Sequence, residues 1–133
     1  MSVKITNLYR SIYGLPNGIQ NMGEGLLVDD QITDRVSLTK TDGEMDRFGS
    51  TYLIREVQTE SSNTSGLTAG GGALYLGANG SGHSRRCPRP TDAEQGEVVK
   101  ADAETGETLD RWKLPMVSGT HGLEFDNFED DIL

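Results

Sequence analysis

The sequence has a single cysteine, Cys87, and no long apolar segment. One cysteine excludes a disulfide within the chain, which suits a reducing compartment. No apolar run approaches the about 18 residues that a membrane-spanning helix needs, and the first residues lack the apolar stretch of a secretory signal peptide. We therefore expect a cytoplasmic protein.

Basic residues are also scarce. The 133-residue chain has 12 Lys and Arg against 21 Asp and Glu, which gives a net charge of −9. This balance argues against nucleic acid and anionic membranes as partners, because non-specific binding to either needs a basic field. The apolar fraction of 34% is modest, but the 17 glycines bring the total into the range of folded domains.

What the chain does contain is a repeat. Three segments open alike, and 48 residues separate the first two openings and 56 the last two: Gly18-Ile19-Gln20, Gly66-Leu67-Thr68 and Gly122-Leu123-Glu124. A tight turn or an acidic stretch follows each opening, and then an apolar run. Repeats of this period that are filled with short strand patterns are typical of radially arranged β-sheets.

Each of the two full units has strand patterns in the same order. The first unit predicts strands at 18–21, 26–29, 34–40 and within 45–57, and the second predicts strands at 73–76, 96–101 and 108–114. Asp42-Gly43 and the glycines at 70–72 predict tight turns. Four antiparallel strands per unit are typical of a propeller blade. A β-sandwich of hairpins is the alternative, but it does not explain the recurrence.

We therefore predict an all-β fold of β-propeller-type, four-stranded antiparallel blades that form an incomplete ring in one chain. Residues 1–133 form a single domain in this prediction. Within it, residues 3–13 are the outer strand of an incomplete blade and residues 118–133 begin a third blade. The two blades between them cover 14–60 and 61–117, and the second carries a loop insertion at 79–95.

The repeat resembles the blades of streptogramin-lyase-like and SMP-30/NHL-type β-propellers. The resemblance covers roughly residues 14–133 and rests on these segments: Leu15-Pro16-Asn17-Gly18-Ile19, Gly25-Leu26-Leu27-Val28, Ser65-Gly66-Leu67-Thr68, Gly70-Gly71-Gly72-Ala73-Leu74-Tyr75 and Thr120-His121-Gly122-Leu123-Glu124. Members of this superfamily usually have about six or seven blades in one chain. This chain departs from that pattern, with about two and a half.

The incomplete ring predicts self-assembly. The strand at 3–13 lacks a blade, and the pair at 122–133 lacks outer strands, so one copy can complete another by strand addition. Two copies would supply about six blades in a twofold ring, so we expect a homodimer or a higher ring. The alternative is a truncated propeller that persists as an open stack of sheets.

The resemblance also places a site at the mouth of the central channel. Streptogramin-lyase-like enzymes use His and Glu residues with Mg²⁺ there, which makes His121 and Glu124 the candidate catalytic and metal-binding residues. The corresponding pairs in the other units are Asn17/Gln20 and Ser65/Thr68, which do not titrate, so Gln20 and Thr68 are candidate ligand-binding residues. The expected cofactor is none or a divalent metal, Mg²⁺ or Ca²⁺. Carboxylates near strand ends (Asp29, Asp30 and Asp126) either join such a site or make turns.

The 79–95 loop is the remaining candidate. It carries Arg85, Arg86 and Arg89, which suit carboxylate or phosphate recognition. Three functions follow from the sequence. The first is a propeller-type protein that binds an unknown small ligand and assembles into a closed ring. The second is a metal-dependent lyase or lactonase that uses His121 and Glu124. The third is an interaction module that presents the 79–95 loop.

Overall fold

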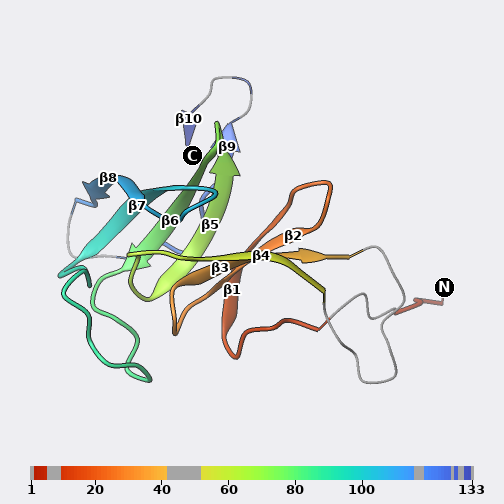
Figure 1. The fold of residues 1–133 in the computed structure, drawn as a ribbon, viewed down its shortest axis with the longest axis horizontal. Coiled ribbons are helices and arrows are strands. Elements are labelled where there is room, and N and C mark those ends of the chain that lie inside the picture. The colour runs from red at the N-terminus through yellow and green to blue at the C-terminus, as the bar shows by residue number, and fades with distance from the viewer. Residues whose placement is uncertain are drawn as a thin grey trace.

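The computed structural model describes residues 2–5, 10–41, 52–115, 119–126, 128 and 131–132. In these residues the protein is all-β, with two four-stranded antiparallel sheets and a short two-stranded hairpin (Figure 1). The all-β prediction is confirmed. No helix in the described ranges is long and apolar enough to cross a membrane.

The first sheet has its strands in sequence order, each antiparallel to the next. It consists of β1 (Pro16–Asn21), β2 (Leu26–Asp30), β3 (Arg35–Lys40) and β4 (Tyr52–Gln58). Strand β3 alternates polar and apolar residues in sequence, which is why its position was predictable. The predicted turn at Asp42-Gly43 lies outside the described residues.

The second sheet repeats this order. It consists of β5 (Thr64–Gly70), β6 (Ala73–Asn79), β7 (Gly96–Asp102) and β8 (Thr108–Lys113). Gly71 and Gly72 join β5 to β6 with φ angles of 56° and 78°. Two successive positive φ angles make the type I′ turn that matches the twist of a hairpin, and glycine adopts them without a steric penalty.

The described residues near the two ends of the chain differ in secondary structure. The described residues 119–132 contain a small hairpin of β9 (Phe125–Asp126) and β10 (Asp131–Ile132). Within the predicted outer strand 3–13, the described residues 3–5 and 10–13 form no strand. Instead Tyr13 lies against the first sheet, where its hydroxyl donates to Glu56 at 3.0 Å. Burial raises the pKa of Tyr13, because the phenolate would be poorly solvated there.

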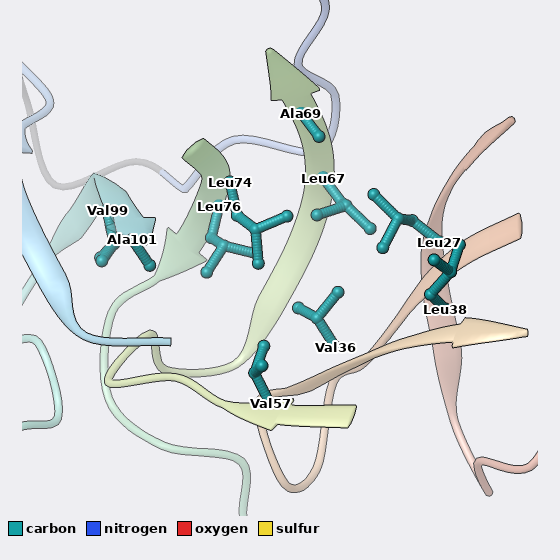
Figure 2. Close-up of a cluster of buried hydrophobic side chains, with 10 residues drawn as sticks. All are labelled: Leu27, Val36, Leu38, Val57, Leu67, Ala69, Leu74, Leu76, Val99 and Ala101. Carbon is teal, nitrogen blue, oxygen red and sulfur yellow. The ribbon is translucent and has the colours of Figure 1, made fainter. Parts of the chain in front are cut away.

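The main core lies between the two sheets (Figure 2). Apolar side chains of the first sheet meet those of the second, and they form one cluster: Leu27, Val36, Leu38, Val57, Leu67, Ala69, Leu74, Leu76, Val99 and Ala101. A smaller cluster covers the other face of the second sheet, where Phe125 packs on Tyr75 with ring centroids 5.7 Å apart. The second sheet is thus covered on both faces, and no sheet in the described residues closes on itself.

Candidate functional site

The segments that open the three repeated units, β1, β5 and residues 122–126, line one cleft. Its volume is about 260 Å³, and its walls are Ile19, Gln20, Asn21, Leu67, Thr68, Leu123, Glu124 and Phe125. These residues come from β1, from β5 and from the stretch that leads into β9. The structure therefore brings together three of the residues predicted for the site: Gln20, Thr68 and Glu124.

Gln20 and Thr68 hold neighbouring units together. The side-chain amide of Gln20 donates to the carbonyl of Ala69 at 3.2 Å, and its oxygen accepts the Ala69 N–H. One unit later, the Thr68 hydroxyl accepts the N–H of Phe125 at 2.9 Å. In both cases a polar side chain in one inner strand binds the backbone of the next unit. These two side chains are therefore already engaged within the chain.

Glycine lets the opening segments of successive units approach one another closely. A Cβ built on Gly18 would lie 2.6 Å from the Cβ of Leu67, and one on Gly66 would lie 3.1 Å from the nitrogen of Gly122. A side chain at either position would push the next unit away. The glycines that open the first two repeats are thus required by the contact between units.

Glu124 is the free polar group of the cleft. Its side chain is exposed, and it makes no hydrogen bond or ion pair with the described residues. His121 is exposed too but does not line the cleft. The structure therefore does not place this imidazole beside this carboxylate in one pocket.

The cleft does not fit the metal that the resemblance implies. Ca²⁺ takes about six to eight oxygen ligands, and Mg²⁺ also takes oxygen ligands, in an octahedron. The cleft offers one carboxylate, and the equivalent positions Gln20 and Thr68 bind backbone instead. Among the described residues, no group of three or more His, Cys, Asp or Glu side chains is placed to hold a metal ion.

A polar cluster surrounds the buried Ser65, near the start of β1 and β5. The hydroxyl of Ser65 is the meeting point of three side-chain amides, from Asn17 at 3.3 Å, Gln31 at 3.1 Å and Asn79. This cluster joins the first sheet to the second, as Gln20 does further along β1. It is structural in character, because Ser65 is buried and its partners belong to the chain.

Asp29, on β2, binds the backbone near the start of β1. One oxygen accepts the N–H groups of Asn17 and Gly18, and the other oxygen has no partner among the residues that the structure describes. Burial raises the pKa of Asp29 to about 6, although the two backbone bonds act in the opposite direction. At 0% exposure the carboxyl group does not reach a ligand at the surface. Its neighbour Asp30 accepts the N–H and hydroxyl of Thr33, which is the turn role considered for it.

Two arginines of the 79–95 loop bind inside the chain. Arg86 and Arg89 both form ion pairs with Asp34, at 3.0 and 2.8 Å, and Arg86 also pairs with Asp92. The side chain of Asp34 is 0% exposed and also accepts the N–H and hydroxyl of Thr64, at 3.1 Å each. Hydrogen bonds from Arg86 lower the pKa of Asp92 to about 2.

These ion pairs engage two of the three arginines that were predicted to make the 79–95 loop a recognition element. Its two half-buried guanidinium groups are matched by carboxylates, so Arg85 is the arginine of the loop that stays exposed. Sequence reasoning missed Asp34, because its arginine partners are 52 and 55 residues away along the chain.

No protein-family model matches the chain, and no curated protein matches it either. The resemblance to streptogramin-lyase-like propellers therefore remains a prediction from the repeated motifs.

Proposed function

We propose that this chain is a β-propeller-type binding protein that takes a small ligand in the cleft between its inner strands. The observation that carries the proposal is the convergence of equivalent positions. Gln20, Thr68 and Glu124 have the same place in three successive units, and all three line one cleft. Repeated units whose equivalent residues face a common space are the usual basis of a channel-mouth site in a propeller.

The lining determines the chemistry of the ligand. Glu124 contributes a carboxylate without a partner among the described residues, and the exposed lining of the cleft is mostly polar. A small organic cation such as an amine matches this lining. The net charge of −9 adds attraction for such a ligand over a longer range.

The ring belongs to the same proposal. The two four-stranded sheets contact each other through their first strands, β1 and β5, which supports an arrangement as adjacent blades that further copies of the chain would continue. We propose that the chain acts as a homodimer or a higher ring around the cleft. No specific observation favours the alternatives. The lyase or lactonase would need more ligands beside His121 and Glu124, and the interaction module would need free arginines in its loop.

Light scattering on a size-exclusion column tests the ring. The expected mass is a multiple of the 14.4 kDa of one chain, and a monomer at all concentrations would refute the ring. Calorimetric titration with small aliphatic amines tests the ligand, with the matching alcohols as the neutral control. We expect amines to bind and Glu124→Gln to abolish the preference. Equal binding of amines and alcohols would refute the proposed role of Glu124.

A further inference from the structure

We infer that a second copy of this chain places its strand β1 against residues 122–126, through the same contact that joins the units within the chain. The inference rests on the proposed ring and specifies its interface. One carboxylate oxygen of Glu124 in one copy then accepts the N–H of Asn21 in the other, its second oxygen stays available to a ligand in the cleft, and the second copy adds a wall to the cleft.

The first argument is the repeated link between side chain and backbone. Gln20 binds the backbone of Ala69, the residue after Thr68, and Thr68 binds the backbone of Phe125, the residue after Glu124. Glu124 is the third member of this series, and within the described residues its side chain has no such partner. The residue that follows Gln20 is Asn21, so the next link of the series leads to Asn21 of another copy.

The second argument comes from the glycines. Leu67 approaches Gly18, and Gly122 approaches Gly66, so neither Gly18 nor Gly66 has room for a side chain. A Cβ built on Gly122 would have nothing within 4 Å among the described residues. Gly122, like Gly18 and Gly66, leaves space for a close neighbour. Unlike them, it has no such neighbour among the described residues. A docked β1 strand supplies that neighbour.

The third argument is the exposure of Ile19. Its equivalent, Leu67, is 4% exposed in the core between the sheets, whereas Ile19 on β1 is 58% exposed. Leu67 is thus buried against the preceding unit, whereas Ile19 has no preceding unit in the chain to cover it. A preceding unit from another copy would cover Ile19 as the first sheet covers Leu67.

The contact joins two different parts of the chain. Ile19 and Asn21 lie on β1, and Gly122 and Glu124 lie in the third unit. Two copies can therefore form the contact twice, once in each direction around the ring, which gives a closed twofold assembly. The acidic charge of both copies opposes the contact, so added salt should strengthen it.

Substitutions that spare the single chain test the interface. Gly122→Val places a side chain where the structure has open space, and Ile19→Glu changes an exposed residue, so both variants should fold. Two matched controls change equally open positions outside the interface. Gly14→Val also has nothing within 4 Å of its Cβ, and Leu109→Glu changes a side chain on β8 that is 54% exposed.

The measurement is the mass by light scattering, together with thermal unfolding to confirm the fold. We expect the wild type and both controls to be dimers or higher rings, and Gly122→Val and Ile19→Glu to require at least about tenfold higher concentration to assemble. If the wild type is a ring and both interface variants assemble as it does, the ring stands and this interface is wrong. If the wild type is a monomer, the proposed ring and the interface both fail.

Discussion

Asp34 and Arg89 form a 2.8 Å ion pair between residues that are 55 positions apart in the sequence. Asp34 lies in the turn between β2 and β3, and Arg89 lies in the loop between β6 and β7. The same guanidinium donates to the carbonyl of Ser61 at 2.6 Å, beside the connection between the two sheets. This pair therefore fastens the long loop of the second sheet to the first sheet.

Removing the carboxylate should loosen that attachment. Asp34→Ala leaves the guanidinium groups of Arg86 and Arg89 without their shared partner, and breaking a buried pair in this way costs about 3–5 kcal/mol. We expect the midpoint of urea unfolding to fall accordingly and trypsin to cleave faster at the exposed Arg85. Arg35→Ala is the control, because its ion pair with Glu56 is on the surface and should be worth about 1 kcal/mol or less. An unchanged rate of cleavage at Arg85 would contradict the role of Asp34.

The link between units can be measured at Thr68. Thr68→Val keeps the shape of the side chain but leaves the buried N–H of Phe125 without an acceptor, which should cost about 1–3 kcal/mol of the free energy of unfolding. Urea denaturation measures this loss. Thr91→Val is the matched control, since the Thr91 hydroxyl makes no hydrogen bond with the described residues. Equal stability of the two variants would show that the link contributes nothing.

Asp29 should make stability fall as the pH rises. Its pKa is about 6 in the folded protein and about 3.9 in an unfolded chain, so the folded state binds the proton more tightly. The contribution of Asp29 is therefore fully present below about pH 4 and is lost as the pH rises through about 6.

Asp29→Asn removes this titration. We expect the variant to be more stable than the wild type by about 1–2 kcal/mol at pH 7–8, and the difference to shrink or reverse below pH 4. Urea unfolding of both proteins between pH 3 and 8 measures the difference, which also cancels the titration of the other carboxyl groups. A difference that does not change with pH would contradict the raised pKa of Asp29.

Gly70 allows Phe125 to dock on the second sheet. A Cβ on Gly70 would collide with the Phe125 ring, so Gly70→Ala should displace the ring from Tyr75 and destabilise the protein by about 1–3 kcal/mol. We expect faster hydrogen exchange in residues 122–126. The control is a double-mutant cycle, in which Gly70→Ala costs little once Phe125→Ala has removed the ring. The same cost in both backgrounds would place the collision elsewhere.

The strands were predictable because their signals are local. Alternation at 34–40, the glycine turn at 70–72 and the recurrence of whole units together predicted the strands of both sheets, and the structure has them in that order. The segment at 3–13 has a similar apolar content, but its described residues form no strand. There Tyr13 packs across the first sheet, which is a tertiary contact without a local signature.

The site was predictable only in part, and for a related reason. The repeat indicated that residues 20, 68 and 124 face a common space, and they line one cleft. It did not indicate that Gln20 and Thr68 bind backbone groups 49 and 57 residues away. In a sequence, a polar residue whose partner is distant cannot be told from a polar residue without a partner. The same limit hid the partners of Arg86 and Arg89.

The repeated link between units has a consequence for how such a chain can change in length. Gln20 and Thr68 join their neighbours through backbone groups, which any residue supplies, and Gly18 and Gly66 require only that the neighbour come close. A gene that gained or lost a whole unit would therefore create a junction already suited to its new neighbour. Duplication in steps of one unit preserves the architecture, whereas an insertion within an inner strand would disrupt it.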